Sequence, residues 1–325
     1  MFKIIDRTLS ALQGDKENLS SEMLFEMCSL LNRVGVDYIE LSVPILEKMG
    51  KLPNKGHYIL QIESLEEKER YPGFDLYVWK GKKENELADN IMSEIEVKCI
   101  DELIKNTMPS KGKHIRLVGL DQLMHTEYNV EIKKIMKHFK TPIDFCPQDR
   151  YYCATALAIE WLMNGGKSVS VSFNGVGGYA KLEEVMMGIK VIMHKKVGMD
   201  LSVLPEMSML YEKLTQSRIH YNKAVVGKNI FNIEAGVQIE DSNYEALTYE
   251  PYDPTLVGKT RRLVIGKYSG STAIKLKLKE KGIKVSDEVV DELLGDVKVI
   301  SMNKGRSLTD KEFLLLVKEV VQHED

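Results

Sequence analysis

The sequence has few cysteines and no paired histidines, and both absences narrow the kinds of site that it can carry. Its four cysteines form no C-x-x-C pair, and its seven histidines form no H-x-H pair. Structural zinc sites use cysteine or histidine pairs at such spacings, and disulfide frameworks are typical of short secreted chains that are rich in cysteine. We therefore expect neither kind of site, and a chain of 325 residues does not need disulfide bonds to hold its fold.

The charges are balanced, and no long apolar run is present. With 45 Lys and Arg against 48 Asp and Glu, the net charge is −3, which argues against a protein that binds nucleic acid. No apolar stretch approaches the roughly 18 residues of a membrane span. The first residues also lack the basic and apolar regions of a signal peptide. We expect a cytoplasmic protein without a membrane segment.

Short β-rich runs alternate with helical stretches over the first part of the chain, which predicts βα units and a parallel sheet. An eighth run, Ile95–Cys99, is equally consistent with the start of a helix. A complete (β/α)8 barrel takes about 250 residues, whereas these runs lie within residues 1–198. We therefore expect an α/β fold with a trimmed TIM-type (β/α)8 barrel. The seven clear runs are Lys3–Thr8, Tyr38–Val43, His57–Ile62, Leu76–Trp79, Ile115–Leu120, Pro142–Cys146 and Ser168–Phe173.

Residues 199–325 are expected to form an α-rich C-terminal subdomain region. Met207, Leu210 and Leu214 repeat at helical spacing, which is typical of a buried helix face rather than a ligand site. A turn-rich segment, Tyr249–Gly258, follows, and after it come a strand and amphipathic helices. The predicted domains are thus a barrel, residues 1–198, and a helical C-terminal region, residues 199–325.

Three stretches in the second half carry motifs that are too specific to follow from composition. Residues 173–187 read F-N-G-V-G-G-Y-A-K-L-E-E-V-M-M, and residues 226–236 read V-G-K-N-I-F-N-I-E-A-G. Residues 248–258 read T-Y-E-P-Y-D-P-T-L-V-G, and G-K-Y-S-G follows at residues 266–270. These stretches resemble signatures of the homocitrate synthase and isopropylmalate synthase family, most closely the homocitrate synthases of nitrogen fixation. The resemblance is specific from Ala154 to Leu316 and weaker before that.

The resemblance implies a metal-dependent barrel followed by helical C-terminal subdomains. Members of the family condense acetyl-CoA with a 2-oxo acid such as 2-oxoglutarate and then hydrolyse the thioester. That chemistry needs a metal to hold the 2-oxo acid, a cation over the developing alkoxide and a base for the acetyl methyl group. In family dimers, the C-terminal region of one chain lies over the barrel of the other.

Polar positions of the family's barrel motifs hold other residues here. Where the opening strand of the family has an Arg and a metal-binding acid, in D-T-T-L-R-[DE]-G-E-Q, this chain has Ser10 and Ala11. The two histidines of H-x-H-N-D fall on Phe145 and Pro147. Ala, Phe and Pro side chains have no lone pair for a metal. We therefore expect no metal, no other cofactor and no catalytic residue in this chain.

The motifs of the second half change in the same way. The two histidine positions of H-E-S-G-I-H hold Ile233 and Gln238, and the E-R of N-G-x-G-E-R is Gly178-Tyr179. The glycine turns remain, which indicates that the family's catalysis is lost while its fold is retained. A slip of the alignment in the N-terminal half is the alternative, because the alanines after residue 153 are one residue out of step with the family.

A few residues remain candidates for binding. By the resemblance, Tyr249, Asn174 and Glu40 are the candidate substrate-binding residues. Arg7 lies three residues from the position of the family's Arg, so we expect it to be solvated or ion-paired rather than catalytic.

Two further groups of residues leave alternatives open. The basic cluster of Lys259, Arg261 and Arg262 either meets a CoA phosphate or faces solvent. A rebuilt metal site is conceivable at Asp121 with His125, or at Asp144 with Cys146, but neither pair belongs to a cluster at ligand spacing.

Three functions are consistent with this sequence. The first is a non-catalytic subunit, in a homo- or hetero-oligomer with a catalytically intact homologue. The second is an active synthase with a rearranged site. The third is a regulator that binds an acid or CoA in the old barrel pocket. The first agrees best with an intact C-terminal scaffold beside altered barrel motifs.

Overall fold

The computed structural model describes residues 2–12, 19–80, 88–98, 100–101, 103, 114–139, 141–194, 198–234 and 250–324. Contacts divide the chain into two compact units, each described here by itself. The first unit comprises residues 1–220 and 224–226, and the second comprises residues 221–223 and 227–325. Helix α8, Leu204–Thr215, lies in the first unit, where it packs against α1, Ser21–Val34.

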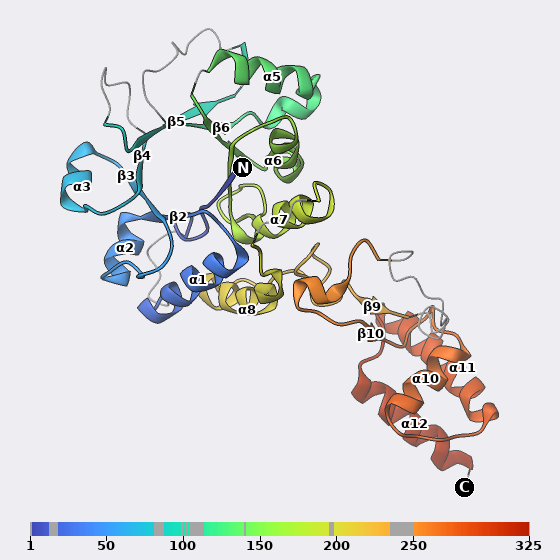
Figure 1. Ribbon diagram of the computed structural model, residues 1–325. Coiled ribbons are helices and arrows are strands. Elements are labelled where there is room, and N and C mark those ends of the chain that lie inside the picture. Colours follow the sequence, from blue (N-terminus) through green and yellow to red (C-terminus); the bar gives the residue numbers. More distant parts are fainter. Residues whose placement is uncertain are drawn as a thin grey trace. The chain divides into compact units, whose positions relative to one another are not determined.

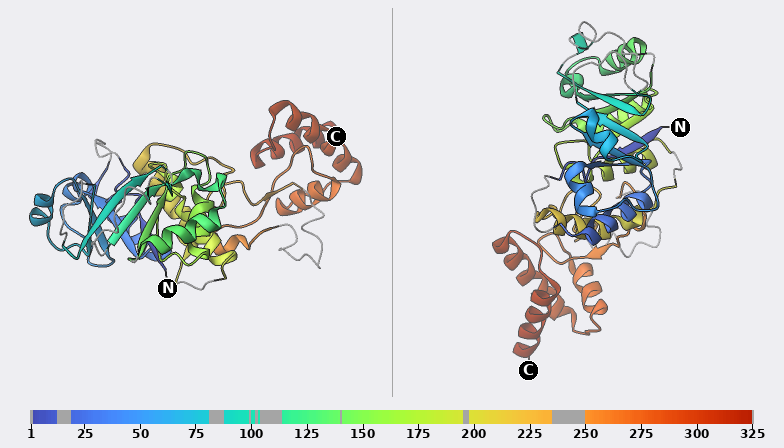
Figure 2. Two further views of the ribbon diagram at one scale, coloured as in Figure 1. Left: turned by 90° about the horizontal axis from the view of Figure 1, so that it is seen from above. Right: turned by 90° about the vertical axis from the view of Figure 1, so that its left-hand side faces the viewer.

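The first unit contains a closed barrel of eight parallel strands, which confirms the predicted TIM-type fold (Figure 1). Sequential strands are neighbours, and the last strand returns to the first, where Ile4 lies opposite Val169. Figure 2 shows the barrel from two further sides. The strands are β1 Lys3–Asp6, β2 Tyr38–Ser42, β3 Tyr58–Ile62, β4 Leu76–Trp79, β5 Ile91–Val97, β6 His114–Gly119, β7 Ile143–Pro147 and β8 Ser168–Val171.

The eighth run of the sequence is a strand, and it begins earlier than expected. Ile95–Cys99 was consistent with either a strand or a helix, but Ile91–Val97 forms β5 and pairs with both β4 and β6. Only residues 80–90 join β4 to β5, and the described part of that connection carries no helix. The barrel is trimmed at this point.

Helices cover the outside of the barrel (Figure 1). In α1, the Ser20 side chain accepts a hydrogen bond from the Met23 amide, and Gly35 ends the helix at a φ of 96°. A serine N-cap and a left-handed glycine C-cap are favoured helix boundaries. No helix in the described residues is long and apolar enough to cross a membrane. The other helices of this unit are α2 Val43–Met49, α3 Leu65–Arg70, α5 Tyr128–His138, α6 Ala154–Met163 and α7 Leu182–Val191.

The barrel interior changes from apolar to charged along the strands. Ile5, Ile59, Val78 and Met92 form a buried apolar cluster. Alternate residues of a strand face the same side, so the residue two positions beyond Met92, which is Glu94, also faces inward. A layer of charged side chains therefore lies next to the apolar layer, toward the carboxyl ends of the strands.

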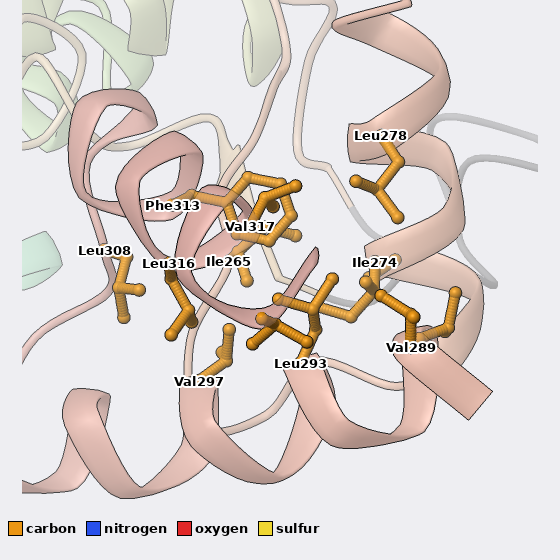
Figure 3. Close-up of a cluster of buried hydrophobic side chains, with 13 residues drawn as sticks. Ile265, Ile274, Leu278, Val289, Leu293, Val297, Leu308, Phe313, Leu316 and Val317 are labelled. Atoms are coloured by element: carbon orange, nitrogen blue, oxygen red, sulfur yellow. The ribbon is translucent and has the colours of Figure 1, made fainter. Parts of the chain in front are cut away.

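The second unit contains three helices around an apolar core (Figure 3). Leu293 and Val297 of α11 pack with Phe313 of α12 and with Ile274 of α10. Burial of these side chains is the main source of this unit's stability. Its elements are β9 Asn232–Ile233, β10 Arg262–Leu263, α10 Ser271–Glu280, α11 Asp287–Lys304 and α12 Asp310–Glu324.

Candidate functional site

The charged layer of the barrel is centred on Arg116, which is completely buried in β6. Its Nη1 atom donates to Glu40 Oε2 at 2.5 Å and lies 3.4 Å from Glu94 Oε2. Its Nε atom donates to Asp144 Oδ2 at 2.5 Å. Three carboxylates from β2, β5 and β7 thus converge on one guanidinium group. The Arg116 Nη2 atom makes no hydrogen bond in the described structure.

Arg7, directly after β1, is the second buried cation and is 2% exposed. Its Nε atom donates to Glu40 Oε1 at 2.9 Å, and its Nη2 atom lies 3.3 Å from Glu94 Oε2. The Arg7 Nη1 atom donates to Cys146 Sγ at 3.2 Å. The Tyr179 ring covers the guanidinium group, with 4.5 Å between the ring centroid and Cζ. Of the two alternatives for Arg7, the structure shows the ion-paired one.

Serine hydroxyl groups also donate to two of these carboxylates. Ser168 and Ser170 in β8 donate to the two oxygens of Asp144 at 2.7 and 2.6 Å. Ser10 donates to Glu40 Oε1 at 3.0 Å. We refer to Arg7, Glu40, Glu94, Arg116, Asp144 and Cys146 as the barrel cluster. It has three carboxylates and two guanidinium groups, and a further cation, Lys80 Nζ, lies 3.6 Å from Glu94 Oε1.

The pKa values follow from this environment. Burial opposes ionisation of Glu40, but the charges of Arg116 and Arg7 outweigh it and lower the pKa of Glu40 to about 2. Burial raises the pKa of the Cys146 thiol to about 11, despite both arginines. Glu40 is therefore a carboxylate at neutral pH, and Cys146 is a thiol rather than a nucleophilic thiolate.

The structure changes which residues of β7 represent the family's histidine positions. Phe145 packs against Trp161 of α6, with ring centroids 5.0 Å apart, so it faces the outer helix and not the barrel interior. Asp144 and Cys146 face inward instead, and they contact Arg116 and Arg7. Two inward side chains at a spacing of two is the arrangement of H-x-H. The expectation that Phe145 and Pro147 occupy those positions is therefore wrong by one residue.

The structure describes two of the three candidate substrate-binding residues, Glu40 and Asn174. Glu40 lies at the centre of the barrel cluster. Asn174 lies after β8 in a left-handed conformation, with a φ of 56°. Its backbone N–H donates to Glu183 Oε2 at 2.9 Å. Tyr249 lies outside the described residues. Of the two described candidates, contacts place Glu40 in the barrel cluster and Asn174 beside Glu183.

The proposed alternative metal pairs and the basic cluster have protein partners. Asp121 lies 3.3 Å from Arg150, whereas the His125 ring packs edge-on against another aromatic ring. Arg261 binds Glu250 with both Nε and Nη2, so this side chain is ion-paired rather than fully solvated. Within the described residues, no group of three or more His, Cys, Asp or Glu side chains is placed to hold a metal.

Several cavities accompany the barrel in the described residues, and one of about 180 Å³ is lined by Lys98, Leu120 and Glu131 among others. A cavity of about 80 Å³ lies at the carboxyl ends of β5–β7, lined by Glu96, Asp121, Gln148 and Arg150 among others. Ligand pockets usually measure about 300 to 1,000 Å³. A cavity of about 500 Å³ is lined by residues that follow α2 and α3, such as Gly50 and Phe74. It lies at the amino ends of the strands, opposite the face that carries active sites in such barrels.

The retained motifs of the second unit have structural roles. The Glu234 carboxylate accepts from the Tyr268 amide at 3.0 Å, and the Ser269 hydroxyl donates to the Glu234 carbonyl. A Cβ on Gly266 would lie 2.6 Å from the Glu234 carboxylate, so a larger residue would require that side chain to move. The two family motifs, at residues 226–236 and 266–270, thus hold each other in place.

Sequence reasoning missed Arg116 and Glu94. The signal available was a charged residue near the centre of a short apolar strand, as in Y-I-E-L-S around Glu40 and H-I-R-L-V-G around Arg116. Charged residues are almost never fully buried unless they are paired. Several such strands in one barrel therefore indicate a set of mutual partners.

Comparisons with known proteins identify relatives for both parts of the chain. A family model described as "Homocitrate synthase post-HMGL domain-like" matches residues 225–305. The homocitrate synthase omega subunit of Clostridium pasteurianum is 28% identical over 338 residues, which cover 97% of this chain and 95% of that protein. Homocitrate synthase AksA of Methanothermobacter thermautotrophicus is 34% identical over 192 residues. That match covers 58% of this chain and 49% of AksA, so the chain spans about half the length of that relative.

Solved structures give the same fold at low sequence identity. The HMG-CoA lyase of Bacillus subtilis aligns with a TM-score of 0.54 and 14% identity, over 67% of this chain and 95% of that chain. An HMG-CoA lyase bound to coenzyme A and 3-methylmalate aligns with a TM-score of 0.52 and 11% identity, over 67% of this chain and 92% of that chain. At such identities, the likeness establishes the barrel fold alone.

Proposed function

Because the chain is a relative of the homocitrate and isopropylmalate synthases, we propose that it is a non-catalytic subunit of an enzyme that condenses acetyl-CoA with a 2-oxo acid. The observation that carries the proposal is the closed barrel cluster. Glu40 and Arg116 are fully buried, and Tyr179 covers Arg7. A substrate needs accessible coordination or hydrogen-bonding positions at such a site. Here Glu40 is held by both arginines, and Arg116 Nη2, which makes no hydrogen bond in the described structure, is itself buried.

The scaffold of the second unit supports a role in assembly. Glu234 and the turn at residues 266–270 keep their mutual hydrogen bonds, although histidine positions of the motifs have changed. The name of the Clostridium pasteurianum relative, an omega subunit, supports a multi-subunit enzyme. We propose that the partner is a homologue that retains the R-[DE]-G and H-x-H motifs, in the cytoplasm.

The test is to purify the chain with and without such a homologue from the same organism. Release of CoA thiol from acetyl-CoA and 2-oxoglutarate is measured for each protein and for the mixture. We expect no turnover by the chain alone and a higher rate for the mixture than for the homologue alone. Light scattering should show a complex.

Tyr249 is the residue of this chain that we propose contributes to the partner's site. Tyr249→Phe should leave the complex intact and reduce the gain in rate, whereas Tyr268→Phe, at an exposed position of the same unit, is the matched control. Turnover by the isolated chain would instead favour an active synthase with a rearranged site. Saturable acid or CoA binding without any effect on the homologue would favour the regulator.

A further inference from the structure

The residues at the centre of the barrel do not fit the divalent metal that the family implies. One oxygen of Glu40 binds Arg7 and the other binds Arg116, at 2.9 and 2.5 Å. Asp144 receives hydrogen bonds from Arg116 and from two serines. A divalent ion would have to displace these donors while it lay beside two guanidinium groups, whose charge is permanent.

We propose that Arg7 and Arg116 have taken the place of the metal as the cations of this barrel. Glu40, Glu94 and Asp144 reach the guanidinium groups from three different strands. Buried carboxylates without a counter-charge are costly. The arginines supply that charge as part of the chain, so the barrel keeps its inward carboxylates and folds without a divalent ion.

Two positions on β7 give the clearest support for this replacement. Asp144 and Cys146 have the spacing and the inward direction of an H-x-H pair, and each contacts a guanidinium group: Asp144 binds Arg116 and Cys146 binds Arg7. The side chains at the two positions of the motif therefore still point into the barrel, but they contact arginine in place of a metal ion. This inference concerns the chain alone and does not depend on whether it has a catalytic partner.

The first experiment measures metal binding to the full chain after treatment with a chelator. Mn²⁺ is added, and the free ion is followed by electron paramagnetic resonance. We expect no stoichiometric binding and no change in Tm between excess Mn²⁺ and excess chelator. One Mn²⁺ bound per chain, and lost in Glu40→Gln, would overturn the proposal.

The second experiment separates the charge of Arg116 from its packing. Arg116→Lys keeps a positive charge, whereas Arg116→Met keeps much of the length without it. Removing one partner of a buried ion pair is strongly destabilising, so we expect Arg116→Met to lower Tm by about 10 °C. Arg116→Lys should lower it by less than half as much. Equal losses for the two variants would show that charge is not what Arg116 provides.

A matched control comes from an exposed arginine with similar partners. Arg150 is 55% exposed and pairs with Glu96 and Asp121 at 3.4 and 3.3 Å. Exposed ion pairs contribute little, so Arg150→Ala should change Tm by about 2 °C or less. A loss as large as that of Arg116→Met would contradict the special role of the buried cation.

A double variant keeps the proposal testable if Arg116→Met does not fold. Combining Arg116→Met with Asp144→Asn removes one charge of each sign and leaves Glu40 paired with Arg7, so the double variant should recover soluble, folded protein that Arg116→Met alone does not yield. If Arg116→Met does fold, the double variant should have the higher Tm. A double variant no better than the single one would overturn the proposal.

Discussion

Asp6 at the end of β1 is predicted to make the barrel less stable as the pH rises through neutrality. Burial raises the pKa of its carboxyl from 3.8 to about 7, against hydrogen bonds from Thr8 that lower it. A group whose pKa is higher in the folded state contributes stability that is fully present below its unfolded pKa. That contribution is lost as the pH rises to the folded pKa.

The magnitude follows from the two pKa values. A rise from 3.8 to about 7 corresponds to about 4 kcal/mol over the full range. Between pH 5 and pH 8, the part that is lost is about 2 to 3 kcal/mol. Glu40 titrates outside this window, because its pKa is lowered to about 2, and its contribution is lost only in acid.

The perturbation is Asp6→Asn, which keeps the size of the side chain and removes its ionisation. Unfolding of wild type and variant by urea is compared at pH 5, 6, 7 and 8. The free energy of unfolding of the variant relative to wild type should increase by about 2 to 3 kcal/mol from pH 5 to pH 8. A constant difference reports only altered hydrogen bonds to Thr8. If the difference does not change with pH, the reasoning about Asp6 is refuted.

Three further predictions concern single sites. Gly177→Ala should lower the free energy of unfolding, measured in urea, by about 2 kcal/mol, because φ is +78° and a Cβ would lie 2.8 Å from the Tyr179 ring. Gly50→Ala, at a φ of +75° with open space around it, should lower the same free energy by about half as much. Ser286→Ala removes the N-cap of α11 and should lower the unfolding free energy of the second unit by about 1 kcal/mol, measured by circular dichroism. Cys146, buried and with a pKa of about 11, should not react with Ellman's reagent at pH 8 until the protein unfolds, so native wild type and Cys146→Ser should give equal thiol counts.

The sequence predicts local features of this fold better than it predicts the barrel cluster. Helix α1 follows from apolar spacing and from caps at its two ends, which are local signals. Strand β5 was ambiguous because inward residues such as Glu94 are charged, so the usual apolar pattern of a buried strand is broken. The contact between Arg7 and Cys146 joins residues 139 positions apart, and only closure of the barrel brings them together.

The alignment of β7 shows a second limit of reasoning from motifs. Phe145 was placed at a ligand position by matching letters, but a shift of one residue exchanges the two faces of a strand. Its contact with Trp161 fixes the true direction. The candidate Tyr249 stays a prediction, since it lies outside the described residues.

The buried ion pairs also restrict how this sequence can drift. Glu40 pairs with both Arg7 and Arg116, but Asp144 pairs with Arg116, so replacing Arg116 alone leaves the buried Asp144 carboxylate without the guanidinium group that it contacts. A single substitution of this kind is strongly destabilising, whereas a second substitution that removes the opposite charge can compensate for it. A change of Arg116 in β6 is therefore expected to require a matching change of Asp144 in β7.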